Sequence, residues 1–141
     1  NNIFIHGRTD DVINIRGHRI GSEEIESTLL QLKNVIEVAA ISIPDEIEGN
    51  VFYVFIACKK NSGYLKKAVN TKIHKNFGSF AIPKDVYMVK ELPKTRSGKI
   101  LRRILRNILT NNEITQYDTS TLLKKSVVLN IKKIIKQNTN D

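Results

Sequence analysis

Hydrophobic residues along this 141-residue chain recur with two different periods, and each change of period marks an expected element. Residues 35–43 and 51–58 are rich in β-branched and aromatic side chains and are separated by a polar turn, so they predict an antiparallel pair of strands. Residues 85–89 predict a third, short strand. The opening segment 3–20 alternates short apolar runs with polar residues and Gly17, which predicts a small β-ribbon, polar at its tip and outside the core.

Two helices are predicted where apolar residues lie three or four positions apart. Ser22, followed by two glutamates, predicts the N-cap of a helix over about 22–33. Its apolar face is expected to carry Ile25, Leu29 and Leu32. Steps of four residues predict a second helix that ends near Gly78 and has four apolar residues on one face: Leu65, Val69, Ile73 and Phe77.

A loop over 92–98, whose Pro, Ser and Gly disfavour regular structure, separates these elements from two further helices. The helix after this loop is expected to carry six apolar residues on one side: Ile100, Leu101, Ile104, Leu105, Ile108 and Leu109. Residues 110–121, rich in Asn and Thr, predict a linker to a last helix, whose apolar side is Val127, Val128, Ile131, Ile134 and Ile135.

Strands and helices therefore interleave around one sheet. We expect an α+β fold, with a small mixed sheet of about three strands flanked by helices and an N-terminal β-ribbon. A chain of this length can build one ordinary core, so the prediction is a single compact domain of about 100 to 110 residues plus a tail.

The net charge of the chain indicates which class of partner it can bind. The chain has 23 basic and 14 acidic residues and a net charge of +9, which attracts an anionic partner such as nucleic acid, acidic lipid or a polyphosphate cofactor. No apolar run reaches the roughly 20 residues that span a bilayer, so we expect a soluble protein. The single Cys58 lies in an apolar run, which predicts a buried, reduced thiol.

Lys99 is the first candidate for chemistry, because it stands where a Ser-Gly turn meets an amphipathic helix. An ammonium group projected from such a loop can offset the repulsion between a carboxylate and a phosphate; the plain alternative is a solvated surface lysine. A P-loop is excluded, because no glycine lies five residues before Gly98 and Ile100 replaces the required Ser or Thr. Three arginines of this helix either keep it solvated or meet phosphates: Arg102, Arg103 and Arg106.

Two N-terminal segments hold the other candidates. Residues 7–11 (Gly-Arg-Thr-Asp-Asp) form either a polar turn or a hinge. Gly17 next to Arg19 is either a hairpin turn or a place where an extended ligand passes close to the backbone while the guanidinium takes a phosphate. We expect no metal site within this chain, because Cys or His partners at metal spacing are lacking for His6, His18 and His74.

The order of these motifs resembles the C-terminal domain of the acyl-adenylate-forming enzymes. The resemblance is carried by residues 7–21 (with GRTDDVIN and GHRIG), by 23–26 (EEIE) and by 92–103 (LPKTRSGKILRR). Both end motifs look like the acetyl-CoA and propionyl-CoA synthetase branch in particular. Residues 77–83 and 118–122 are similar to the same branch.

The resemblance implies a reaction in two steps. A carboxylic acid attacks the α-phosphorus of ATP to give acyl-AMP and pyrophosphate, and the thiol of coenzyme A then takes the acyl group while AMP leaves. Mg²⁺ and most contacts to ATP would lie on a large N-terminal domain. Residues 1–11 would be the hinge and interdomain linker, 12–109 the AMP-binding enzyme C-terminal domain and 110–141 a tail with a helix. This piece alone is expected to be inactive.

The resemblance also implies roles for single residues. Lys99 matches the lysine that orients the carboxylate and ATP in the first step, Arg8 matches the arginine that contacts the ribose, and Asp10 matches the hinge about which the domain swings. After that swing Gly17 would border the pantetheine channel, and Arg19 would serve the passage or the phosphates of coenzyme A.

Two positions depart from the family pattern and bear on coenzyme binding. Position 16 is Arg where small residues are usual, and His74 stands where the family often has an arginine near the coenzyme's nucleotide. Lysines that match Lys99 are acetylated reversibly in this family, so a lysine acetylase and a deacetylase are expected partners. The cytoplasm is the expected location, with a nuclear or organellar pool as the alternative. A basic module for nucleic acid or anionic membranes is the alternative of another class.

Overall fold

The computed structural model describes residues 12–139 except 16, 48, 60–62 and 111–125. Its centre is a sheet of three strands in the order β3-β4-β5, made of β3 (Val35–Asp45), β4 (Gly49–Cys58) and β5 (Asp85–Val89). β3 and β4 are antiparallel, whereas β4 and β5 are parallel, so the sheet is mixed. The predicted α+β fold with a small mixed sheet is therefore confirmed.

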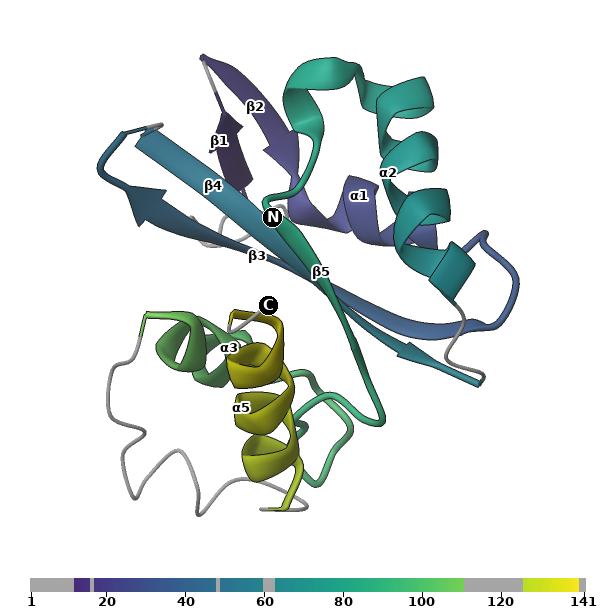
Figure 1. Cartoon of the computed structure of the whole chain (residues 1–141), viewed down its shortest axis with the longest axis vertical. Coiled ribbons are helices and arrows are strands. Elements are labelled where there is room, and N and C mark those ends of the chain that lie inside the picture. Colours follow the sequence, from purple (N-terminus) through teal and green to yellow (C-terminus); the bar gives the residue numbers. More distant parts are fainter. Residues whose placement is uncertain (1–11, 16, 48, 60–62, 111–125, 140–141) are drawn as a thin grey trace, which may run out of the picture.

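One face of the sheet is covered by α1 (Ser22–Leu29), α2 (Gly63–Phe77) and the antiparallel hairpin of β1 (Val12–Ile15) and β2 (His18–Gly21) (Figure 1). A short 3-10 turn, η3 (Ser79–Ala81), follows α2. The prediction that the N-terminal ribbon lies outside the core is wrong. Its three isoleucines alternate inward and are at most 7% exposed in the same core as α1 and α2: Ile13, Ile15 and Ile20.

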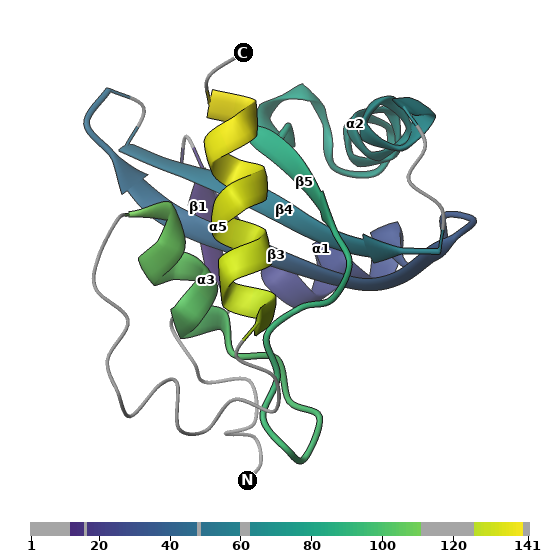
Figure 2. The same cartoon turned by 60° about the horizontal axis from the view of Figure 1, so that its bottom comes forward.

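The other face is covered by α3 (Arg102–Leu109) and α5 (Ser126–Thr139), which lie side by side in front of the sheet in Figure 2. α5 coincides with the last helix that the hydrophobic pattern predicts. It is packed against the sheet, and its buried residues belong to the same core as those of α3: Val127, Val128 and Ile131. The described part of the C-terminal region is therefore an integral layer of the domain.

The start of α1 differs from the prediction. Gly21 is the N-cap residue, and no side chain caps the helix, whereas Ser22 is already its first residue and is only 1% exposed. The hydroxyl of Ser22 is buried and has no hydrogen-bond partner among the described residues. The helix also ends at Leu29, earlier than predicted, although Leu32 in the following turn still packs against the core. None of the described helices is long and apolar enough to cross a membrane.

Candidate functional site

Lys99 lies near the tip of a loop that is closed by its own backbone. The amide of Thr95 donates to the carbonyl of Lys99 at 2.9 Å, and the amide of Leu101 donates to the carbonyl of Pro93 at 2.9 Å, so the two arms of the loop are tied to each other. Gly98 turns the chain between them with φ +92°, a conformation that favours glycine. The result is a small hairpin-like loop, residues 93–101, from which Lys99 projects.

Two hydroxyls stiffen this loop from within. The side-chain oxygen of Thr95 accepts a hydrogen bond from the amide of Lys99 at 3.2 Å and lies 2.9 Å from the hydroxyl of Ser97. The side chain of Lys99 itself is exposed, and no ion pair holds its ammonium group within the described part of the chain. The backbone is therefore fixed while the charge remains available to a ligand.

Two carboxylates hold the arms of this loop to the rest of the domain. Glu26 of α1 forms a bidentate ion pair with the guanidinium of Arg102, the first residue after the loop. Glu37 of β3 pairs with Lys94 at 2.6 Å on the incoming arm. Each arm thus has an ionic contact to α1 or β3 beside its hydrophobic packing.

The tip of the β1–β2 hairpin carries the second group of candidates. Gly17 has φ +84°, and a Cβ built there would meet no atom within 4 Å, so the glycine is required by the turn and stands beside open space. Arg19 is exposed on β2, opposite Asn14 of β1. His18 stacks on Phe80, with ring centroids 4.0 Å apart, which joins the hairpin to the turn that follows α2.

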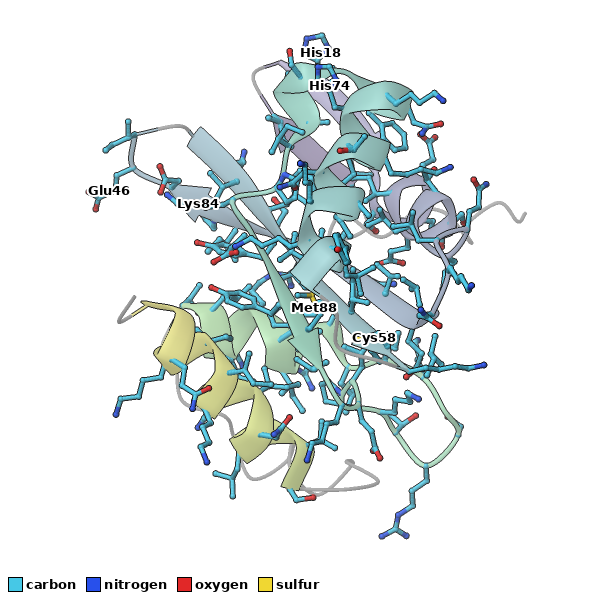
Figure 3. The ribbon with its side chains drawn as sticks, turned by 45° about the vertical axis from the view of Figure 1, so that its right-hand side comes forward. His18, Glu46, Cys58, His74, Lys84 and Met88 are labelled. Atoms are coloured by element: carbon cyan, nitrogen blue, oxygen red, sulfur yellow. The ribbon has the colours of Figure 1, made fainter. Side chains whose placement is uncertain are left out.

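His74 lies at the same end of the molecule as His18 (Figure 3). It is exposed near the C-terminal end of α2, and its carbonyl accepts the amide of Gly78 at 3.0 Å. The residue that stands where the family often has an arginine is therefore close in space to the hairpin motif, although it is far from it in sequence. Arg8 and Asp10 lie outside the described residues.

The loop of Lys99 and the tip of the hairpin lie at opposite ends of the domain. Figure 1 shows the hairpin at the top of the view and the chain between β5 and α3 at the bottom, with the sheet between them. The sheet therefore separates the two groups of candidate residues.

The model of one known family, described as the AMP-binding enzyme C-terminal domain, matches residues 24–99. The chain belongs to this family. The matched segment begins in α1 and ends at Lys99, so it contains the sheet, α2 and most of the loop described above.

Relatives with known names are similar to this AMP-binding C-terminal domain. The chain is 46% identical over 127 residues to an acetyl-coenzyme A synthetase of Penicillium chrysogenum, which covers 89% of this chain and 19% of that protein. It is 42% identical over 133 residues to an acetyl-coenzyme A synthetase of Chlorobaculum tepidum, which covers 92% of this chain and 20% of that protein. The chain thus spans about a fifth of the length of the curated relatives it matches.

Solved structures agree in fold. A crystal structure of an acyl-CoA synthetase from Brucella canis is 34% identical, with a TM-score of 0.67 over 74% of this chain and 20% of that one. ATP-bound MatB from Rhodopseudomonas palustris is 25% identical, with a TM-score of 0.65 over 72% of this chain and 20% of that one.

Sequence reasoning missed Glu26 of this domain. The signal was present, because Ser22, Glu26 and Leu29 have the helical spacing that places residues on one face, and that face is buried. A carboxylate at a buried position needs donors, and here it takes Arg102 as its partner. Arg102 is therefore no solvating residue, and Arg106 likewise donates its Nε to the carbonyl of Ser42 at 3.3 Å.

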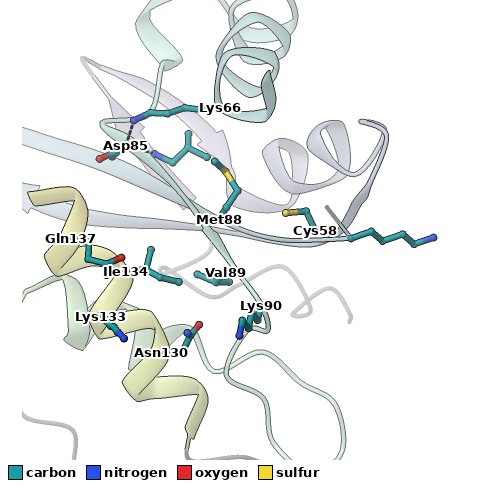
Figure 4. Close-up of a pocket in the computed structure, with 12 residues that line it drawn as sticks. Cys58, Lys66, Asp85, Met88, Val89, Lys90, Asn130, Lys133, Ile134 and Gln137 are labelled. Atoms are coloured by element: carbon teal, nitrogen blue, oxygen red, sulfur yellow. Dashed lines mark hydrogen bonds and ion pairs between the residues drawn. The ribbon is translucent and has the colours of Figure 1, made fainter. Parts of the chain in front are cut away.

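A hollow lies elsewhere, between α2, β5 and α5 (Figure 4). It has a volume of about 790 Å³ and contains no residue of the motifs that match the family. Lys66 at its rim pairs with Asp85 at 2.6 Å. Cys58 also lines it as a free, partly buried thiol, and burial raises the pKa of that thiol. Among the described residues, no three of His, Cys, Asp or Glu gather as a metal site would require.

Proposed function

We propose that this chain is the mobile C-terminal domain of an acetyl-CoA synthetase, which activates acetate with ATP to acetyl-AMP and then transfers the acetyl group to coenzyme A. The proposal is supported by identities of 42% to 46% to acetyl-coenzyme A synthetases over nine tenths of this chain. The observation that carries it is the exposed Lys99, which forms no ion pair with any residue that the structure describes and stands on a loop whose backbone is tied in place.

Lys99 would act in the first step. Both reactants are anionic, so an ammonium group placed between the carboxylate and the α-phosphate lowers their repulsion and orients them. A lysine suits this task because its charge is compact and its stem is flexible. Arg8 would contact the ribose of ATP, while Mg²⁺ and most of the nucleotide would be held by a larger N-terminal domain.

The second step would use the other end of the domain. Rotation about Asp10 withdraws the ammonium group and brings the hairpin to the same cleft, where Gly17 leaves space for the pantetheine chain and Arg19 meets phosphate. His74, at this end too, would take part in holding the coenzyme's nucleotide. The opposite placement of the two groups is the physical reason for the rotation.

The experiment separates the two half-reactions by rapid kinetics in the full-length synthetase. Lys99→Ala should abolish formation of acetyl-AMP yet leave transfer from supplied acetyl-AMP to coenzyme A unchanged, and Asp10→Pro, which stiffens the hinge, should do the reverse. Lys67→Ala, which removes an exposed lysine of α2, is the matched control and should change neither step. Equal loss of both steps in Lys99→Ala would refute the role of Lys99 in the first step. The isolated 141 residues should form no acyl-AMP.

Two further points belong to this proposal. Propionate is the alternative acid, and the ratio of kcat/KM for acetate and propionate decides between them.

Acetylation of Lys99 by a lysine acetylase, reversed by a deacetylase, would remove the charge and stop the first step. Mass spectrometry that finds Lys99 unmodified in both acetate-rich and starved cells would count against this regulation.

The nucleic-acid module is not favoured, because several of the basic side chains that contribute to the net positive charge are engaged within the domain. Lys84 pairs with Asp45, Lys94 pairs with Glu37, and Arg102 pairs with Glu26. A filter-binding titration against salt checks this, and nanomolar binding of DNA or RNA at physiological salt would reverse the ranking.

A further inference from the structure

Glu26 is a carboxylate placed on the buried face of a helix. It is 8% exposed on α1, between Ile25 and Leu29, which are fully buried. A charge at such a position is retained only if donors replace the lost water. Its oxygens receive both terminal nitrogens of Arg102, one of them at 2.8 Å, and the amide of Ala40 at 2.8 Å.

These donors come from two elements other than α1, which carries Glu26. Ala40 belongs to β3, the outer strand of the sheet, and Arg102 begins α3 on the opposite face. The carboxylate therefore reaches around the edge of the sheet and fixes α3 against α1 and β3. Packing of buried leucines and isoleucines alone would not fix the orientation of α3, because apolar contacts have no directional preference, whereas hydrogen bonds to a guanidinium do.

The start of α3 needs this carboxylate for a second reason. The helix begins with Arg102 and Arg103, has no acid in its first turn, and has no side-chain cap. Positive charge at a helix N-terminus is unfavourable, because the exposed amides already give that end a partial positive charge. Glu26 supplies the negative charge from another helix, and the fork geometry holds the first residue of α3 in one orientation.

Arg102 is only three residues from Lys99, and the intervening chain is fixed. The amide of Leu101 is bound to Pro93, and the carbonyl of Lys99 is bound to Thr95. A displacement of Arg102 must therefore be transmitted to the loop that carries the ammonium group. Glu37 and Lys94 fix the other arm, so the loop is held at both ends by carboxylates.

Resting on the function proposed above, we propose that Glu26, acting through Arg102, is a positioning residue for Lys99 in the adenylation step. It does not touch the reactants. It sets the place from which the ammonium group reaches them, and a misplacement of about 1 Å in such a group can cost about 100-fold in rate.

The test uses the full-length synthetase and measures both half-reactions. Glu26→Gln keeps the shape and removes the charge, so adenylation should slow by about 10- to 100-fold while transfer from supplied acetyl-AMP stays within about twofold. Glu24→Gln changes an exposed carboxylate on the same helix and should leave both rates unchanged. Amide exchange at Thr95 and Leu101 should quicken in Glu26→Gln, with the amides of β4 unaffected.

The outcomes separate the two proposals. Equal loss in both half-reactions, or a normal adenylation rate in Glu26→Gln, overturns the positioning role even where Lys99→Ala blocks adenylation. A normal adenylation rate in Lys99→Ala overturns the proposed function, and with it the positioning role that rests on it. If Glu26→Gln does not fold, Arg102→Lys decides, because it keeps the charge but replaces the fork by a single ammonium group; it should show the same selective loss, and an unaltered adenylation rate refutes the positioning role.

Discussion

The imidazole of His18 stacks on the ring of Phe80, with centroids 4.0 Å apart and planes inclined by 24°. This contact joins the exposed tip of the β1–β2 hairpin to the turn after α2, and Phe80 also packs against the core that the hairpin shares with α1 and α2. The hairpin is therefore held at its base by buried isoleucines and near its tip by one aromatic pair.

Phe80→Ala should loosen the tip of the hairpin without unfolding the domain. Loss of the stack and of part of its hydrophobic contact should lower the free energy of unfolding by about 1–3 kcal/mol. Hydrogen exchange should quicken at the amides of β2 more than at those of β4. Ile47→Ala, at a side chain that is 93% exposed, is the control and should change neither quantity. Exchange that quickens equally in β2 and β4 would contradict the prediction.

Gly98→Ala should strain the loop of Lys99. An alanine at φ +92° costs about 1–2 kcal/mol, and no neighbouring atom is close enough to add a steric clash. Gly21→Ala is the matched control, because Gly21 has φ −70° and its new Cβ would lie 3.9 Å from Glu24. Urea unfolding should separate the two variants by about 1 kcal/mol or more. Equal stability of the variants would show that the turn tolerates a side chain.

Tyr87 makes the domain sensitive to alkaline pH. It is 4% exposed against Phe55 and Tyr53, and burial, followed by the charges of Asp85 and Tyr53, raises its pKa to about 12. The unfolded chain ionises this phenol near pH 10, so between about pH 10 and 12 the unfolded state binds fewer protons than the folded one. Its contribution to stability is thus complete below about pH 10 and falls by roughly 2 kcal/mol toward pH 12.

Urea unfolding at several pH values measures this effect, and absorbance of the phenolate reports the ionisation itself. Tyr87→Phe should flatten the decline between about pH 10 and 12 relative to the unchanged protein. An identical decline in both proteins would assign the effect to other groups.

Cys58 should react slowly with thiol reagents. Burial raises the pKa of its thiol, so less thiolate is present at neutral pH than for a free cysteine. The rate at which a disulfide reagent modifies Cys58 should lie below that of a small thiol at pH 7. This rate should increase with pH as more of the thiol ionises. Protein unfolded in urea should react at the rate of the small thiol. A faster reaction in the folded state would contradict the burial argument.

Much of the fold follows from local pattern. The β-branched and aromatic side chains of β3, β4 and β5 identify strands, and the apolar residues four positions apart in α2 identify a helix. Each of these signals lies within one short segment of sequence. Local pattern alone also explains why the hairpin is wrongly predicted to lie outside the core. Its isoleucines are interleaved with Asn14, Gly17 and His18, and nothing local tells which face of such a ribbon meets the core.

The site could be predicted only in part. Lys99 and Gly17 follow from motifs that are contiguous in sequence, and the structure adds that the β1–β2 hairpin and the chain between β5 and α3 lie at opposite ends of the domain. Glu26 and Arg102 are 76 positions apart, so their pairing depends on how α1, β3 and α3 pack. Ser22 has the right type for an N-cap, yet the chain enters the helix one residue earlier and buries it.

The sheet separates two cores that share few side chains. Val38 and Ala40 point into one, whereas Ala39 and Ile41 point into the other. Energetic effects of substitutions in the two layers should therefore add, because distant sites without common partners are independent. Over evolutionary time the layer that carries the β1–β2 hairpin and the layer that carries α3 can diverge at separate rates. The bond around the sheet edge between Glu26 and Arg102 is where that independence should break down, and where compensating substitutions should gather among related sequences.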